Sequence, residues 1–222
     1  MRVLGIDTAT RTASVGIVEG EELLAERCQA ASLRHGLSLL ALVEEVLNTA
    51  GMAWGDLEGI AVSIGPGSFT GLRVGLSTAK GIAFAQGLPL VGIPTLRALA
   101  LAADVREGIV SPILDARKGE VYAALFRVEE GQVDYLVEEC AMALEAWLSR
   151  LPGPCTFIGD AVAMLNGNGD RLGRILPFER FFPRGSIVAS LGAGALAEGR
   201  AANVATLEPL YVRPSEAEKR FS

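Results

Sequence analysis

A chain of 222 residues, half of them apolar, is long enough to bury one large core or two smaller ones. Its formal net charge of −6 argues against a surface that grips a nucleic-acid backbone unaided. The three cysteines are scattered and form no Cys-x-x-Cys, which disfavours a disulfide framework or a zinc knuckle and predicts a reducing cytoplasm. Charged residues interrupt the first apolar run, and no uncharged stretch is long enough for a membrane span, so we expect neither a signal peptide nor a membrane helix.

Residues 1–105 predict one α/β unit. Apolar runs separated by turn residues predict three strands at the start, the first of which ends at Asp7. Leucine and valine recur at helical spacing over 34–50, and Gly51 closes that predicted helix. The predicted elements are strands 2–6, 13–18 and 22–27, helix 34–50, strand 59–64, helix 70–85, strand 88–93 and helix 95–103.

The pattern restarts at about residue 108. A predicted strand ends at Asp115 and is again followed by polar residues, a strand, an acidic-glycine turn and a third strand. This repetition favours a duplicated lobe over 106–222, although chance resemblance between only two copies stays open. The late helix, 187–198, could return to the first lobe. The predicted elements are strands 109–114, 121–128 and 132–137, helix 144–151, strand 156–158, a turn at Gly159-Asp160, a glycine-rich loop at 166–169 and helix 187–198.

The stretch 64–75, IGPGSFTGLRVG, joins a predicted strand to a predicted helix. Gly65 and Gly67 free the backbone on either side of Pro66, and Ser68 can cap the helix. One interpretation is an anion or phosphate cradle, because such a turn gathers several N–H groups. The other, which spacing alone favours, is a tight turn that needs glycine for steric reasons. The motif lacks the Lys of a Walker loop.

Several segments together resemble the bacterial TsaB (YeaZ) family. These are VLGIDTAT at 3–10, GPGSFTGLRVG at 65–75, Lys80-Gly81, LDARKGEVY at 114–122 and PLYVR at 209–213. The resemblance covers essentially the whole chain. It implies the α/β, two-lobed, actin-like (ASKHA) fold with duplicated ββαβα-type lobes, of which the second is reduced.

The resemblance also implies a function. It makes the chain a non-catalytic partner, a pseudoenzyme that docks TsaD, which moves threonylcarbamoyl from threonylcarbamoyl-adenylate onto N6 of adenosine 37 in tRNAs reading codons that begin with A. The resemblance further implies that the ATPase TsaE joins the complex and that the chain forms a homodimer when alone. It implies that the chain contacts tRNA only as part of the complex. TsaD-like proteins bind metal with His-x-x-x-His, whereas the matching residues here are His35 and Leu39. One imidazole cannot build that site, so we expect no metal. By the resemblance, we also expect no cofactor and no catalytic residue.

The second predicted helix carries small residues every four positions, which lays a flat stripe along one face. In a soluble protein such a stripe more often marks internal packing than an interface. The first predicted helix, however, is apolar on more than one face, which a single buried stripe does not require. By the resemblance, these helices form the surface that meets TsaD. The candidate interface residues are Leu39, Leu40, Val43, Leu47, Gly71, Arg73, Gly75, Ala79 and Ala83.

Two other functions stay open. One is an ATP-dependent, actin-like phosphotransferase, and the other is a dimeric interaction module without a role in tRNA modification. A Ser–His–Asp hydrolase is disfavoured, since His35 is the only histidine and no G-x-S-x-G is present. Each strand-ending aspartate is favoured as a cap of its own turn. A local basic pair, Arg117 and Lys118, could contribute to a tRNA contact. The candidates for a vestigial nucleotide or phosphate loop are Asp7, Gly65, Gly67, Ser68 and Asp115.

Overall fold

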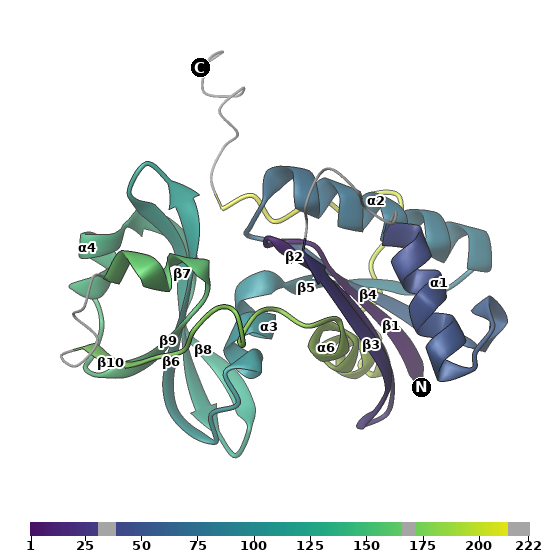
Figure 1. Ribbon diagram of the computed structural model, residues 1–222, viewed down its shortest axis with the longest axis horizontal. Helices are drawn as coiled ribbons and strands as arrows, with labels where there is room; N and C mark the ends of the chain where they lie inside the picture. The colour runs from purple at the N-terminus through teal and green to yellow at the C-terminus, as the bar shows by residue number, and fades with distance from the viewer. Residues whose placement is uncertain (31–38, 166–171, 213–222) are drawn as a thin grey trace, which may run out of the picture. The chain divides into compact units, whose positions relative to one another are not determined.

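The computed structural model describes residues 1–30, 39–165 and 172–212, and the chain divides into two compact units (Figure 1). Unit 1 comprises Met1–Ala98 and Pro183–Pro209, and unit 2 comprises Leu99–Phe182 and Leu210–Ser222. Within the described ranges, no helix combines the length and the apolar character needed to cross a bilayer.

Unit 1 is built on a five-stranded sheet in the order β3-β2-β1-β4-β5. Strand β1 pairs antiparallel with β2, where Asp7 stands opposite Ser14, and parallel with β4, where Ile6 stands opposite Val62. The next residue of β4, Ser63, therefore lies beside Asp7. The strands are β1 (Arg2–Asp7), β2 (Thr12–Glu19), β3 (Glu22–Ala30), β4 (Gly59–Gly65) and β5 (Leu90–Pro94).

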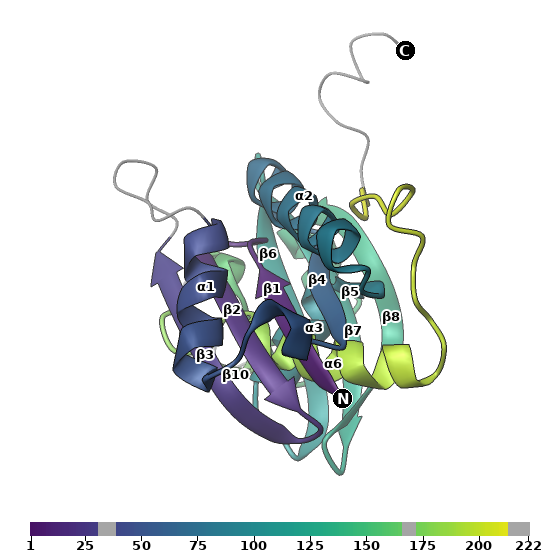
Figure 2. The same cartoon turned by 90° about the vertical axis from the view of Figure 1, so that its right-hand side faces the viewer.

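Helices cover both faces of this sheet. Helices α1 (Leu39–Ala50) and α2 (Phe69–Gln86) lie on one face, and α6 (Gly185–Ala197) lies on the other (Figures 1 and 2). Successive side chains of a strand point to opposite faces of the sheet, so β1 contributes to both layers. Leu4 and Ile6 pack in the cluster under α1 and α2, whereas Val3 packs with α6. The short element η1 (Trp54–Asp56) completes the unit, and α3 (Thr95–Ala102) begins in unit 1 and ends in unit 2.

The N-terminus of α6 is fixed to the sheet by hydrogen bonds across a long sequence separation. The Gly185 N–H donates to Ser14 Oγ over 2.8 Å. The Glu26 carboxylate accepts from the Ser186 N–H over 2.9 Å and from Arg184 Nε over 2.8 Å. These bonds satisfy N–H groups that a helix start leaves unpaired, and they hold the returning helix on unit 1.

Unit 2 repeats the sheet in the order β10-β9-β6-β7-β8. Its core on one face gathers around Trp147 and Phe157, and the buried Trp147 Nε1 donates to Ser111 Oγ over 2.9 Å. The elements are β6 (Glu107–Arg117), β7 (Glu120–Glu129), β8 (Gln132–Ala143), α4 (Leu144–Leu148), β9 (Cys155–Ile158), η2 (Asp160–Leu165) and β10 (Gly173–Ile175).

The predicted two-lobed α/β fold with a duplicated, reduced second lobe is confirmed. Written from the other end, the second sheet reads β8-β7-β6-β9-β10, which matches β3-β2-β1-β4-β5 strand for strand. The predicted helix over 144–151 is shorter, ending at Leu148, and η1 and β10 were not predicted. The predicted loop at 166–169 and His35 lie outside the described residues.

Candidate functional site

The glycine turn between β4 and α2 is held by the chain itself. Ser68 caps α2, with its Oγ accepting from the Gly71 N–H over 3.3 Å. The Ser68 N–H donates to Ala9 O over 2.7 Å, and the Gly65 N–H donates to Thr95 Oγ1 over 3.1 Å. These two N–H groups are therefore already used inside the protein. The contacts favour the steric interpretation of the turn over the phosphate cradle.

The loop that follows β1 packs directly against the glycines at the start of α2. A Cβ at Gly71 would lie 2.0 Å from Thr8 O, and one at Gly75 would lie 2.2 Å from Thr8 Oγ1. The Thr8 hydroxyl donates to Gly71 O over 2.7 Å. Glycine is needed at both positions because any side chain would displace Thr8.

The small-residue stripe of α2 therefore packs internally, which corrects its assignment as a docking surface. Ala79 and Ala83 belong to the buried cluster of unit 1, so all four members of the stripe face their own unit. On α1, Val43 and Leu47 are buried in the same cluster and Leu39 packs partly against it. Buried side chains such as these stabilise the monomer and offer no surface to a second protein.

Apolar surface is instead exposed on the outer side of α2. We define the docking face as Val74, Ser77, Gly81, Phe84 and Ala85, which recur at helical spacing and are all exposed. Phe84 is 85% exposed and Val74 48%. The face carries no charge in a chain of which 21% is charged. At its N-terminal end, the Arg73 guanidinium stacks 3.8 Å above the Phe69 ring.

A groove of about 370 Å³ adjoins the docking face. Leu40 of α1, which is 45% exposed, forms one wall, and Trp54 of η1 forms another. The remaining lining residues come from α2 and are Thr78, Gly81, Ile82, Ala85 and Gln86. Large exposed apolar groups beside an apolar hollow are typical of protein–protein contact surfaces.

The two strand-ending aspartates share one local role in different surroundings. Asp7 is fully buried and accepts the Ala9 N–H on Oδ1 over 3.2 Å. Burial raises the pKa of Asp7 to about 7, against the opposing effects of the neighbouring Ser63 hydroxyl and the Ala9 N–H. Neither Asp7 Oδ2 nor Ser63 Oγ has a partner at hydrogen-bond geometry.

Asp115 caps the corresponding turn of unit 2. Its Oδ1 accepts the Arg117 N–H over 2.7 Å, and its Oδ2 lies 3.4 Å from the Arg117 guanidinium. In both units the carboxylate thus serves its own turn. In unit 1 the Gly65 and Ser68 N–H groups donate within the protein, which disfavours a nucleotide phosphate at the candidate loop of Asp7, Gly65, Gly67 and Ser68. No group of three or more His, Cys, Asp or Glu is arranged to hold a metal ion among the described residues.

Comparison with known proteins identifies the family. The TsaB proteins of Bacillus subtilis and Escherichia coli, both named "tRNA threonylcarbamoyladenosine biosynthesis protein TsaB", are 32% and 31% identical to this chain, each over 100% of the chain and 98% of the relative. The chain belongs to the TsaB family. A family model described as "TsaD: tRNA N6-adenosine threonylcarbamoyltransferase" matches residues 28–172.

The solved structures agree with this membership. YeaZ from Pseudomonas aeruginosa has a TM-score of 0.82 and 25% identity, over 95% of this chain and 99% of that one. The family predicted from the motifs is confirmed, and with it the actin-like fold. The TsaB family is named for tRNA threonylcarbamoyladenosine biosynthesis, so this TsaB-family chain takes part in that tRNA modification.

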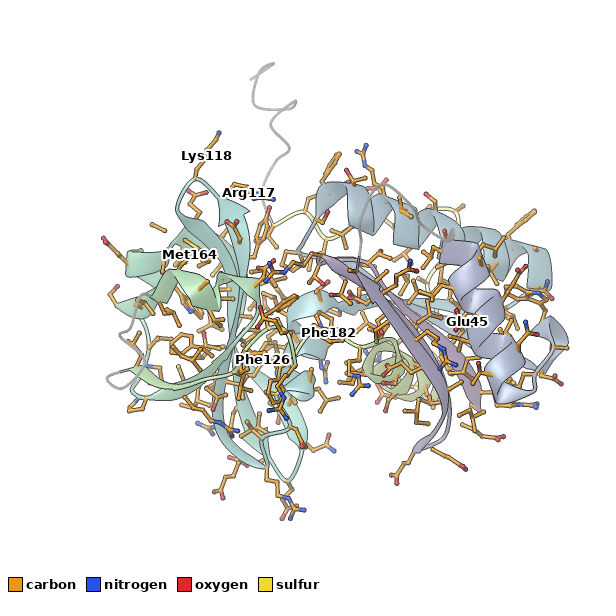
Figure 3. The ribbon with its side chains drawn as sticks, viewed as in Figure 1. Glu45, Arg117, Lys118, Phe126, Met164 and Phe182 are labelled. Carbon is orange, nitrogen blue, oxygen red and sulfur yellow. The ribbon has the colours of Figure 1, made fainter. Side chains whose placement is uncertain are left out.

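The basic pair of this TsaB-family chain lies at the turn between β6 and β7, where Figure 3 shows Lys118 at the tip. Arg117 and Lys118 have positive φ angles of 69° and 56°. The Arg117 side chain is largely exposed, but it faces the Asp115 carboxylate. This pairing offsets part of the positive charge that an RNA contact would use.

Phe84 is the principal functional candidate that the sequence predictions missed. Its signal was present: residues 74, 77, 81, 84 and 85 form an uncharged run along one side of the helix. The small residues at 71, 75, 79 and 83 drew attention to the other side. On α1, exposed Glu45 pairs with Arg27 of β3 over 2.7 Å, so that side of the helix faces the edge strand of the sheet (Figure 3).

Proposed function

We propose that this chain is the non-catalytic subunit that docks and supports TsaD during threonylcarbamoyl transfer to N6 of adenosine 37, in tRNAs reading codons that begin with A. The observation that carries the proposal is the uncharged docking face of α2, with Phe84 85% exposed beside an apolar groove. TsaE joins the complex, and tRNA is bound through the assembled complex in the cytoplasm.

The shape of the surface suits a partner that presents helices. The docking face runs along one side of an 18-residue helix, and the groove lies between that helix, Leu40 and Trp54. A partner helix laid along α2 would cover Val74 and Phe84 and fill the groove with an apolar side chain. Gly81 leaves room there, because nothing lies within 4 Å of the place where its Cβ would stand.

The same surface accounts for a homodimer when TsaD is absent. A two-fold symmetric contact needs a projecting group and a matching hollow on one patch, because each copy uses the same residues. Phe84 projects, and the groove beginning at Gly81 and Ala85 lies next to it. A second copy can therefore bury the same apolar area that TsaD buries.

The absence of chemistry in this subunit is part of the proposal. The Ser68 and Gly65 N–H groups are bonded to the protein, and Asp7 is fully buried. His35 is the single histidine of the chain. These features support a docking role more than an ATP-dependent phosphotransferase, which needs phosphate donors facing its ligand.

The test is the Phe84→Asp variant, with binding to purified TsaD of the same organism measured by calorimetry. A buried aromatic anchor contributes about 2–4 kcal/mol, so we expect affinity to fall by at least about 30-fold and stimulation of tRNA modification to be lost. Phe84 is exposed, so the stability of the free chain should hardly change. Leu136→Asp, which alters an exposed apolar residue of unit 2, is the matched control. Equal TsaD affinity for Phe84→Asp and the wild type would refute docking through this face.

A further inference from the structure

The first half of α2 depends on contacts outside the helix. Gly71 and Gly75 fall within its first two turns, and glycine is the poorest helix former after proline. Leu72 and Leu76 are buried and anchor one side to the core. Such a segment holds a defined position only where tertiary contacts supply what helix propensity does not.

Those contacts come from the loop after β1. The Thr8 hydroxyl donates to Gly71 O over 2.7 Å, and its Oγ1 fills the space in which a Cβ of Gly75 would stand. One residue further on, Ala9 O accepts the Ser68 N–H over 2.7 Å. Thr8 is 8% exposed. The loop and two successive helical turns are thus in direct contact, with no side chain of α2 between them.

The loop is itself well fixed, so it can act as a reference point for the helix. The Asp7 carboxylate accepts the Ala9 N–H, and Thr10 bonds with Thr12 across the start of β2. Both ends of the loop continue directly into the central strands β1 and β2. A shift of α2 relative to the sheet would have to break the Thr8 and Ala9 contacts first.

The opposite side of the same two turns is the start of the docking surface. Arg73 and Val74 lie between Gly71 and Gly75 in sequence and are both exposed, and Arg73 stacks on Phe69. We propose that Thr8 is a positioning residue for docking: through Gly71 and Gly75 it sets where the N-terminal half of α2 presents its outer side chains to a partner. This inference rests on the proposed docking function and assigns a purpose to the glycines of the 64–75 motif.

The hydroxyl and the shape of Thr8 can be tested separately. Thr8→Val keeps the shape and removes the hydrogen bond to Gly71 O, whereas Thr8→Ser keeps the hydroxyl. The matched control is Thr49→Val on the exposed side of α1, which removes a hydroxyl-to-carbonyl bond of 2.8 Å to Glu45 O together with the acceptor of a 3.2 Å bond from the Arg27 guanidinium. Two quantities are measured on each full-length chain: amide hydrogen exchange along α2 without partner, and the dissociation constant for purified TsaD.

Loss of one buried hydrogen bond predicts about fivefold weaker TsaD binding for Thr8→Val and about fivefold faster exchange in the first two turns of α2. The second half of α2 and the strands should exchange as in the wild type. Thr8→Ser should recover most of both losses, and Thr49→Val should show neither.

Three results would overturn the inference. One is unchanged exchange at the start of α2 in Thr8→Val. Another is an equal rise in exchange throughout unit 1, since that would make Thr8 a general stabilising residue. The third is wild-type affinity for TsaD in Thr8→Val in spite of faster exchange at the start of α2. A wild type that fails to bind TsaD would instead refute the proposed function and leave the exchange measurement intact.

Discussion

The two units share a strand order but differ in what lies between the strands. In unit 1 the connections after β3 and β4 carry helices of 12 and 18 residues, whereas the described parts of the matching connections in unit 2, which leave out 166–171, carry α4 with 5 residues and η2 with 6. A sheet of this topology can therefore form with shorter connections. The extra length of α1 and α2 is not needed to build the sheet, and α2 carries the exposed apolar face that we propose for docking.

The aspartates at the ends of β1 and β6 lie in matching turns but in different surroundings. Each accepts the N–H two residues further on, so the local turn is conserved between the units. Around it, Asp7 is fully buried, whereas Asp115 meets solvent and an arginine. The same turn has thus been enclosed by α2 and α6 in one unit and left at the surface in the other.

The largest effect should come from replacing a glycine of α2 on its inner side. We expect Gly75→Leu to lower the free energy of unfolding by about 3 kcal/mol or more, because its Cβ would lie 2.2 Å from Thr8 Oγ1. Gly81→Ala, on the outer side with nothing within 4 Å, should instead raise stability by up to about 1 kcal/mol. Urea unfolding of both variants measures this contrast.

A similar loss of stability in both glycine variants would mean that α2 is not packed on Thr8 as described. The prediction also bears on how docking is tested. Gly75→Leu would weaken TsaD binding by disturbing the fold of unit 1, so only substitutions on the outer side, such as Phe84→Asp, report on the interface itself.

The second prediction concerns the buried carboxyl of unit 1. Burial raises the pKa of Asp7 from 3.8 to about 7, so the folded state holds its proton more tightly than the unfolded state. Stability linked to this group is complete below about pH 4 and is lost as the pH rises toward 7. Asp7→Asn carries no charge, so it should be more stable than the wild type by roughly 2–4 kcal/mol at pH 8 and by little at pH 4.

Unfolding of the wild type and Asp7→Asn in urea across pH 4–8 measures this difference. The gap between the two curves should widen steadily up to about pH 7 and then stay constant. A gap that does not change with pH would show that Asp7 titrates alike in the folded and unfolded chain, and the buried environment described here would then be incorrect.

The same contrast explains what could be predicted from the sequence. Apolar runs, acidic-glycine turns and the repeated strand–Asp pattern predicted both sheets and the duplication, because these signals are local. The spacing of Gly71, Gly75, Ala79 and Ala83 correctly grouped them on one side of α2. It could not tell which side faces the sheet, since that depends on Thr8, more than sixty residues earlier in the chain.

Two further features escaped prediction for physical reasons. Phe84 is an ordinary apolar residue in sequence, and only its exposure makes it a candidate anchor. Strand β10 has three residues and pairs with the short β9, so neither alternation nor length could mark it. Val43 and Leu47 were grouped with Leu40, although burial separates them.

The smallest effect is expected for Asp115 in unit 2, the counterpart of Asp7. In Asp115→Asn the amide oxygen can still accept the Arg117 N–H, so the turn keeps its cap. What is lost is an exposed ion pair with a largely exposed arginine, and such pairs contribute about 0–0.5 kcal/mol. We therefore expect the free energy of unfolding, measured in urea at pH 8, to change by no more than this amount. A loss of unfolding free energy as large as the gain expected for Asp7→Asn would show that the turn of unit 2 is as enclosed as that of unit 1. The two aspartates would then not differ in their surroundings.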